Sequence, residues 1–338
     1  MNAITEKRKT AGVCYAVTDD GIELPVVDLT HPAFQFRASA EELEHIARET
    51  LRGFEKTRRL PGFLLRWLAR RSILMRGTLQ ASGSFVSGLT TYLFKLGPEN
   101  LGSGYAGSMD RRINASLSPL CVRLRLRSMA ELLAQSLGPL LASRPTPLHL
   151  INIGAGAASD SLNALLLLRK SHPGLLEGRR VSIHALDLEP GGPRFGCRSL
   201  ESLLESGAPL CGLDVGFAHV PYDWSEPGRL KQLLQTMGAN DVVACSSEGG
   251  IFEYGSDEHI RSNLAALRAA APDGTCVVAE FMKDCPTARA VIETGKLALK
   301  LRTPAAFQSL VRASGWNVAH LIDTNPLYAV ASLSRAVD

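Results

Sequence analysis

The sequence predicts an α/β protein with a doubly wound, mostly parallel sheet that follows a helical N-terminal segment. From about residue 119, short apolar segments alternate regularly with helical segments, as in sheets with helices on both faces. A glycine-rich turn follows the first apolar segment. The last two apolar segments are joined only by Asp323-Thr324-Asn325-Pro326, a turn sequence, so they must form an antiparallel hairpin.

The elements can be placed in order from these patterns. The first strand ends at Gly154 and the second ends at Asp187, while Gly315 ends the last helix. The expected strands are residues 148–153, 181–186, 215–221, 241–245, 275–280, 316–322 and 327–333. The expected helices are residues 127–141, 159–171, 196–206, 227–236, 257–271 and 304–314.

The first 118 residues have a different texture. Residues 21–28 could form a short hairpin edge, and Ser39 followed by Glu41 and Glu42 is typical of a helix start. Residues 83–107 read as a polar stretch interrupted by glycines. We therefore divide the chain into a mainly helical segment, residues 1–118, and a sheet domain, residues 119–338.

Composition excludes several classes of protein. The chain has 338 residues, of which 45% are hydrophobic, so neither a disordered nor a collagen-like protein is expected. No apolar run approaches the ~18 residues of a membrane span, and no apolar leader follows the first residues, so we expect a cytoplasmic protein. The seven cysteines are scattered without a C-x-x-C pair, which predicts reduced thiols and no metal site.

Residues 52–76 are strongly basic, although the net charge of the chain is only +4. Arginine and lysine side chains are interleaved there with apolar residues at near-helical spacing, against a single acid, Glu55. One interpretation is a helix with a solvated basic face. The other is a docking face for an anionic partner such as a carrier protein. Aromatic residues are too few to favour nucleic acid.

The most informative segment runs from Leu148 to Asp160, where an apolar strand leads into Gly154-Ala155-Gly156 and then into a helix. Such a loop lets the backbone approach a ligand beside free N–H groups of a helix start. A dinucleotide site would want a third glycine, where this chain has Ser159, and an acid about 20 residues on. Asp187 instead lies 33 positions after Gly154, which favours a different nucleotide-binding family.

Residues 120–335 resemble the class I S-adenosylmethionine-dependent methyltransferases, whose Rossmann-like sheet also ends in an antiparallel hairpin. The resemblance implies S-adenosyl-L-methionine as cofactor or sole substrate. It also assigns roles by position: Gly154, Ala155 and Gly156 form the first motif, Asp187 binds ribose, and Asp223 and Trp224 contact adenine. Leu188, next to Asp187, is a further candidate for cofactor binding. The chain departs from the family pattern at Asn152, where an acid is usual, so the methionine end could be bound differently.

The segment after the fourth strand, SSEGGIFEYG, resembles the motif beside the reacting centre. Methyl displacement from a sulfonium needs alignment and exclusion of water, but no metal or covalent nucleophile. Ser246 is a candidate for cofactor binding, while Ser247, Glu248 and Tyr254 are candidates for catalysis. Glu248 could accept a proton or hold a substrate amine. Alternatively, it has a structural role as a helix cap or in a salt bridge.

Residues 1–118 are expected to form a lid over the cleft, as N-terminal segments commonly do in related small-molecule enzymes. Tyr105, within a glycine-rich element, could contact the sulfonium by a cation–π interaction. Arg111 or Arg125 could pair with the cofactor carboxylate; the alternative for residues 122–127 is a solvated face.

A narrower resemblance concerns ELPVVDLTHPAF and SSEGGIFEYGSDEHI, which are similar to bacterial enzymes of nonribosomal-peptide clusters, including azetidine-2-carboxylate synthases. Those synthases let the α-amine of S-adenosylmethionine attack its own γ-carbon and release methylthioadenosine. The sequence thus predicts methyl transfer to a small molecule in bacterial secondary metabolism, with cyclisation as the alternative. A non-catalytic binding module and methylation of nucleic acid or protein are weaker interpretations. The oligomeric state is left open.

Overall fold

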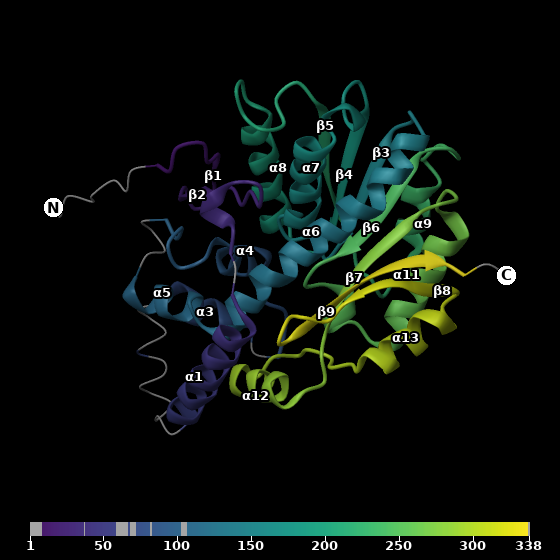
Figure 1. Ribbon diagram of the computed structural model, residues 1–338. Coiled ribbons are helices and arrows are strands. Elements are labelled where there is room, and N and C mark those ends of the chain that lie inside the picture. Colours follow the sequence, from purple (N-terminus) through teal and green to yellow (C-terminus); the bar gives the residue numbers. More distant parts are fainter. Residues whose placement is uncertain are drawn as a thin grey trace.

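The computed structural model describes residues 9–36, 38–58, 67, 72–81, 83–102 and 107–336. Its main feature is a seven-stranded sheet in the order β5-β4-β3-β6-β7-β9-β8 (Figure 1). The strands are β3 (Leu148–Ile153), β4 (Arg180–Asp187), β5 (Asp214–Pro221), β6 (Val242–Ser247), β7 (Cys276–Met282), β8 (Trp316–Ile322) and β9 (Tyr328–Arg335).

The strands β5, β4, β3, β6 and β7 are parallel, and β9 is antiparallel to both β7 and β8. After β3 the chain builds β4 and β5 on one side, and it then returns to place β6 on the other side of β3. The predicted doubly wound sheet with its C-terminal hairpin is therefore confirmed. The sequence did not indicate that β9 would insert between β7 and β8.

Helices cover both faces of the sheet (Figure 1). One hydrophobic core lies beneath α6 (Leu117–Ser143), α7 (Ser159–Ser171) and α8 (Gly191–Leu204), and a second lies beneath α9 (Gly228–Leu234), α11 (Asp257–Ala270) and α13 (Pro304–Ala313). Alternate residues of β3 enter the two cores: Leu148 and Leu150 the first, Ile151 and Ile153 the second. This alternation fixes which strand residues face which helices.

The N-terminal segment shares the first of these cores. It contains β1 (Tyr15–Val17), β2 (Glu23–Pro25), η1 (Pro32–Phe34), α1 (Ala40–Arg58), α3 (Ile73–Gln80), α4 (Gly88–Leu96) and α5 (Ser108–Asn114). The predicted hairpin edge pairs β1 with β2. At the start of α1, Ser39 and Glu42 hydrogen-bond each other's backbone N–H, the capping expected there.

Residues 83–107 differ from the expected polar stretch, because α4 forms within them. Ser87 caps this helix by accepting from the N–H of Thr90 at 3.2 Å, and Tyr92, Leu93 and Leu96 are buried. Tyr92 donates to the carbonyl of Pro25 at 2.8 Å and therefore belongs to the core. The glycines around α4 obscured its short apolar face.

Other helices begin at residues that differ from the predicted ones, for local reasons. α6 begins ten residues before the predicted start because Pro119 is tolerated in the first turn, where no N–H partner is needed. α8 begins with Gly191-Gly192-Pro193, a sequence that reads as a turn. The sequence analysis missed two short helices, α10 (Ile251–Tyr254) and α12 (Pro286–Gly295).

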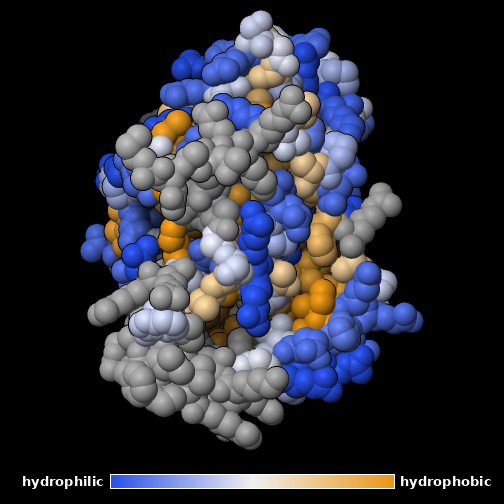
Figure 2. Space-filling model, turned by 90° about the vertical axis from the view of Figure 1, so that its left-hand side faces the viewer, coloured by the Kyte–Doolittle hydropathy of each residue, from blue (hydrophilic) through white to orange (hydrophobic). Residues whose placement is uncertain are grey.

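Residues 59–66 and 68–71 of the basic region 52–76 lie outside the described residues, so its role as a docking face stays a prediction. Within the described part, no helix is both long and apolar enough to cross a membrane. The face turned to the viewer in Figure 2 carries mostly hydrophilic side chains, with hydrophobic ones visible between them. All seven cysteines are free thiols.

Candidate functional site

A cavity of about 190 Å³ opens at the carboxyl ends of β3, β4 and β6. This is the point where the strand order reverses, the usual ligand site of doubly wound sheets. Its walls come from both parts of the chain: Phe85, Val86, Gly88, Thr91 and Lys95; Gly154, Ala155, Gly156 and Ala157; Leu186, Asp187, Leu188 and Glu189; Tyr222 and Trp224; and Glu248, Gly249 and Tyr254.

The loop after β3 needs its glycines for conformation. Gly154 and Gly156 have φ of +69° and +48°, and Ala158, which precedes α7, is also left-handed at 49°. The N–H of Gly154 donates to the carbonyl of Leu186 at 2.8 Å, which ties the loop to β4. The loop thus turns sharply and presents backbone to the cavity.

Three further glycines pack directly against this loop. A Cβ on Gly192 would lie 2.7 Å from the Cα of Gly156, and one on Gly88 would lie 2.9 Å from the same atom. A Cβ on Gly250 would lie 2.5 Å from the carbonyl of Ile153. The sequence analysis missed these contacts; the Gly191-Gly192 and Gly249-Gly250 pairs were the available signals. The loop is held by backbone–backbone contact from α4, α8 and the segment after β6.

Asp187 holds the loop from the end of β4. Its Oδ2 accepts from the N–H of Gly156 at 2.8 Å, and its Oδ1 accepts from the N–H of Glu189 at 3.0 Å. A carboxylate has about four acceptor positions, so each oxygen keeps one for a ligand. Asp187 lines the cavity and is half-buried. It can therefore position the loop and accept from a diol.

An aromatic wall lies beside the glycine loop. The ring of Phe85 meets the ring of Trp224 edge-on at 5.5 Å and that of Tyr254 at 4.9 Å between centroids. Phe85 is 51% exposed, so this wall borders solvent. The hydroxyl of Tyr254 accepts from the N–H of Val86 at 3.4 Å, and burial raises its pKa. Tyr254 is therefore a neutral phenol at physiological pH, suited to contact a cation but not to accept a proton.

Buried charged side chains form a second feature of the site. We call them the ionic cluster, which consists of Lys95, Arg125, Glu248, Glu253 and Glu280. Lys95 Nζ donates to Glu248 Oε2 at 2.5 Å, and Arg125 Nε donates to Glu248 Oε1 at 3.1 Å. Arg125 Nη1 also donates to Glu253 Oε1 at 2.7 Å. Lys95 and Glu248 line the cavity, and each is only 6% exposed.

The pKa values in this cluster diverge. Burial alone would raise the pKa of Glu248, but the neighbouring charges of Lys95 and Arg125 outweigh it and lower the pKa. Burial, with repulsion from Glu253, raises the pKa of Glu280 well above its usual range. Burial likewise raises the pKa of Glu253. Glu248 is thus held as an anion, while Glu253 and Glu280 retain a proton more readily.

Comparison with known proteins gives matches to solved structures only. No family model and no curated protein matches the sequence. Among solved structures, a possible exported protein from Bordetella parapertussis is similar with 18% identity and a TM-score of 0.57, over 91% of this chain and 99% of that chain. Magnesium protoporphyrin IX methyltransferase from Synechocystis PCC 6803, with bound S-adenosylhomocysteine, is similar with 12% identity and a TM-score of 0.43, over 66% of this chain and 89% of that chain.

A third similar structure is the 1,6-didemethyltoxoflavin-N1-methyltransferase of Burkholderia thailandensis, with 15% identity and a TM-score of 0.39, over 63% of this chain and 79% of that chain. The deciding observation is topological: five parallel strands with the glycine loop after β3, closed by β9 inserted antiparallel between β7 and β8. This topology agrees with the fold that the sequence resemblance to class I methyltransferases predicts.

Several of the residues predicted from the sequence line the cavity, and others do not. Gly154, Ala155, Gly156, Asp187, Leu188, Trp224, Glu248 and Tyr254 line it. Asp223 is exposed, and its carboxylate accepts from the N–H of Ser225 at 2.8 Å, while its neighbour Tyr222 lines the cavity instead. Arg111 is exposed on α5 and is not among the lining residues.

Asn152 lies beneath the loop on the face of β3 that meets α7. Its Nδ2 donates to Asp160 Oδ1 at 2.5 Å, and both residues are buried. Ser246 bonds to the carboxyl of Asp160, whereas Ser247 donates to the carbonyl of Ile153 at 2.7 Å. Asn152 and Ser246 point to the face of the sheet that meets α7, and Ser247 points to the other face. None of the three lines the cavity.

Two further expectations concern the N-terminal part. Tyr105 lies outside the described residues, so its contact with the sulfonium stays a prediction. Arg125 is 2% exposed, bonded to Glu248 and Glu253, and stacked on Tyr328 at 4.6 Å from the ring centroid. The sequence analysis missed Lys95 entirely, because the helix that carries it was not predicted.

Proposed function

We propose that this protein binds S-adenosyl-L-methionine in the cavity and acts on a small molecule by methyl transfer. The glycine loop with Asp187 at the reversal of strand order carries the proposal, because it brings backbone without side chains and a carboxylate to the wall of the same cavity. Asp187 accepts from the ribose hydroxyls, and Trp224 packs against the adenine with Leu188 and Tyr222 nearby. Asp223, next to Trp224, remains a proposed acceptor for the adenine amine.

The aromatic wall then meets the charged sulfur. When bound, the cofactor supplies a sulfonium-activated methyl group. Phe85 and Tyr254 offer the negative faces of their rings to that charge, and their bulk excludes water from it. Ser246, Ser247 and Asn152 support the loop from below by the hydrogen bonds already described. Glu248 is a weak base because its pKa is lowered, so its role is electrostatic rather than proton transfer.

The N-terminal segment, residues 1–118, acts in this proposal as the cover of the cleft. Its described residues reach three separate walls: Gly88 touches the glycine loop, Phe85 touches Trp224 and Tyr254, and Lys95 bonds Glu248. Tyr105 and Arg111 remain proposed contributors to this cover. The cytoplasm is proposed from the scattered, free cysteines, and bacterial secondary metabolism from the sequence resemblance.

A second candidate is intramolecular cyclisation of S-adenosylmethionine to azetidine-2-carboxylate with release of methylthioadenosine. It is favoured by the direct contacts of Phe85, Gly88 and Lys95 with other residues of the cavity wall. Phe85, Gly88 and Lys95 line the same cavity as Asp187 and Glu248. An enclosed, folded aminobutyryl chain would bring its amine to the γ-carbon, which is a gain in proximity.

One experiment separates the candidates. Purified protein is incubated with S-adenosylmethionine alone and then with a panel of small hydroxyl and amine acceptors, and products are followed by mass spectrometry. S-adenosylhomocysteine formed only with an acceptor supports methyl transfer. Methylthioadenosine formed without an acceptor supports cyclisation and overturns methyl transfer. Binding without any turnover would identify a non-catalytic module, and absence of binding would overturn the proposed function.

A further inference from the structure

We propose that Glu253 and Glu280, which we call the acid pair, share one proton in the free protein and release it to the solvent when a positively charged ligand enters the cavity. The protein thereby distinguishes S-adenosylmethionine, whose sulfur is positively charged, from S-adenosylhomocysteine, whose sulfur is neutral. This inference rests on the proposed function and adds a proton to the binding equilibrium. It starts from two buried acids that methyl transfer does not use.

The ionic cluster contains one more acid than it has bases. Its bases are Lys95 and Arg125, and its acids are Glu248, Glu253 and Glu280. None of these five side chains is more than 5% exposed. With all five ionised, the cluster would hold one unbalanced negative charge away from water, which is costly. The free protein therefore keeps one proton on the acids.

That proton is held by the acid pair. Lys95 and Arg125 both contact Glu248 and hold it as a carboxylate. The carboxyl groups of Glu253 and Glu280 hydrogen-bond each other, which requires a proton on one of them. Arg125 Nη1 lies 2.7 Å from Glu253 Oε1 but 3.9 Å from Glu280 Oε1. Glu280 is therefore the acid that carries the proton in the free protein.

Two phenols also face the acid pair, besides Arg125 and Glu248. Tyr254 follows Glu253 on α10, and Tyr328 comes from β9. Burial raises the pKa of both phenols, so each stays neutral at physiological pH. Neither phenol can balance an ionised Glu280.

The acid pair lies directly behind the cavity wall. Glu280 Oε1 accepts from the N–H of Gly249 at 2.8 Å, and Glu253 precedes Tyr254 in the chain. Both Gly249 and Tyr254 line the cavity. Within the described part of the chain, Glu280 Oε2 has no donor partner. A positive charge in the cavity can supply the compensation that an ionised Glu280 lacks, because buried charges interact more strongly than charges in water.

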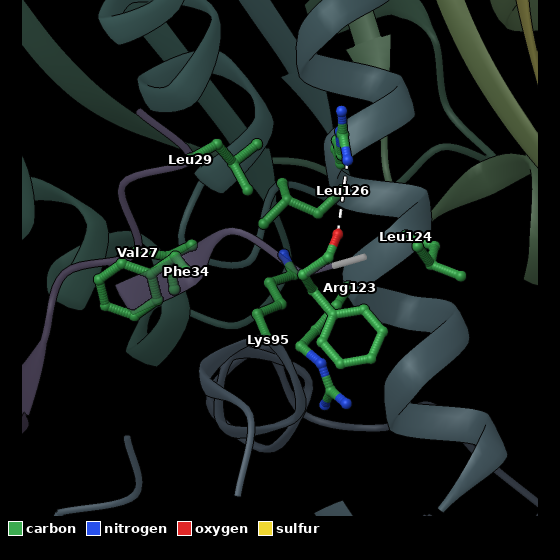
Figure 3. A pocket seen from close by; sticks show the side chains of 9 residues that line it. Val27, Leu29, Phe34, Lys95, Arg123, Leu124 and Leu126 are labelled. Carbon is green, nitrogen blue, oxygen red and sulfur yellow. Dashed lines mark hydrogen bonds between the residues drawn. The ribbon is translucent and has the colours of Figure 1, made fainter. Parts of the chain in front are cut away.

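Lys95 cannot supply that charge, because its ammonium is already bonded to Glu248 at 2.5 Å. Among the described residues, Glu248 is the only carboxylate within ion-pair distance of Lys95. Figure 3 shows Lys95 extending from α4 into a small cavity of about 20 Å³, near Val27, Leu29 and Leu126. These three apolar side chains offer the ammonium no second anion. The missing positive charge must come from a ligand.

Charge balance separates the two forms of the cofactor. With a sulfonium in the cavity, loss of the proton leaves the cluster and the ligand sulfur neutral together. With a thioether in the cavity, the same loss would leave a buried negative charge without a partner. Binding of S-adenosylmethionine therefore releases a proton, so its affinity rises with pH relative to that of S-adenosylhomocysteine.

The test measures proton release by calorimetry on the full chain, in two buffers of different ionisation enthalpy at the same pH. Both ligands are titrated into the wild type and into Glu280→Gln, which keeps the shape of the side chain but has no proton to release. At pH 7 the wild type should release up to about one proton more per S-adenosylmethionine than Glu280→Gln does. With S-adenosylhomocysteine the two proteins should exchange equal numbers of protons. The ligand's own groups titrate in both proteins and cancel in this comparison.

The affinities give a second readout. Between pH 6 and pH 8, the preference of the wild type for S-adenosylmethionine over S-adenosylhomocysteine should rise by up to about 10-fold per pH unit more than that of Glu280→Gln. An analogue with a protonated amine in place of the methylated sulfur replaces S-adenosylmethionine if the latter is consumed during the titration.

Two further variants complete the design. Glu253→Gln also leaves as many acids as bases, so it serves if Glu280→Gln does not fold, and it should abolish the extra proton release in the same way. Glu258→Gln is the matched control, because Glu258 is an exposed carboxylate paired with Arg261 at 3.7 Å. This control should release as many protons as the wild type.

The outcomes are distinct. Equal proton release by the wild type and either Gln variant of the acid pair, on binding S-adenosylmethionine, overturns the shared proton while leaving the proposed function intact. An extra release that is as large with S-adenosylhomocysteine overturns the discrimination of sulfur charge. If neither variant folds, a wild-type affinity ratio that stays constant with pH overturns the inference as well. Failure of the wild type to bind either ligand overturns the proposed function, and the proton linkage with it.

Discussion

The cavity has two walls that are built in different ways. The glycine-loop wall consists mainly of backbone, gathered around Gly154 and Gly156 and held by Asp187. The ionic wall consists of buried side chains that α4, α6 and the segment after β6 bring together. The first wall is sensitive to volume, because backbone meets backbone there. The second is sensitive to charge, because its buried ionised groups depend mainly on one another for compensation.

The largest effect expected is at the ionic wall. Glu248→Gln keeps the shape of the side chain but leaves Lys95 and Arg125 facing a neutral amide, and breaking a buried ion pair from one side costs about 3–5 kcal/mol. The free energy of unfolding, measured in urea, should fall by that amount. A loss below about 1 kcal/mol would mean that water reaches the cluster and that this wall is not especially sensitive to charge.

Asp187 tests the polar anchor of the glycine-loop wall. Asp187→Ala should weaken binding of S-adenosylhomocysteine by about 1.5–3 kcal/mol, because hydrogen bonds to a charged acceptor are lost. Asp214→Ala is the control and should bind like the wild type. Asp214 is exposed at the amino end of β5, whereas the cavity lies at the carboxyl ends of the strands. Calorimetry on folded variants gives both values. Unchanged affinity in Asp187→Ala would remove this residue from the site.

The volume sensitivity of the same wall is tested by adjacent glycines. Gly192→Ala places a methyl group 2.7 Å from the backbone of Gly156, so the loop must shift, and overpacking of this kind costs about 1–3 kcal/mol. At Gly191 a Cβ would meet nothing within 4 Å, so Gly191→Ala should be nearly neutral. Thermal unfolding and S-adenosylhomocysteine affinity should both separate the two variants. Equal behaviour of the pair would show that the loop yields easily.

The smallest effect is a pH dependence of the ionic wall. The pKa of Glu280 is raised by burial and by Glu253, so its stabilising contribution is complete below the unfolded pKa and is lost as pH rises toward the native pKa. Glu280→Gln cannot lose a proton. Its stability relative to the wild type should therefore grow as the pH rises from 5 to 8 in denaturant titrations.

Glu258→Gln is the control for that titration. Glu258 is an exposed carboxylate paired with Arg261 at 3.7 Å, so its replacement should leave the pH profile as it is. If the advantage of Glu280→Gln shrinks as pH rises, then Glu280 is ionised in the native protein, and the proton is held elsewhere in the cluster.

The two walls also differ in how far the sequence predicted them. The loop after β3, its glycines and Asp187 follow strands of ordinary pattern, so their place at one sheet edge came from alternation alone. Lys95 could not be found in this way, because α4 was hidden among glycines and its partner lies 153 positions away. Arg125 was considered as a cofactor ligand, but the tertiary structure turns it to Glu248, Glu253 and Tyr328.

The sequence by itself determined the doubly wound sheet, the terminal hairpin and the glycine loop, because each depends on short-range periodicity and on backbone conformations that few residues adopt. Only the tertiary structure decided the insertion of β9 between β7 and β8, the contact of Gly88 and Gly192 with the loop, and the partners of Glu248. These features depend on which distant segments meet. Charge pairing and close backbone approach arise only when distant segments come together, so they leave little local pattern along the chain.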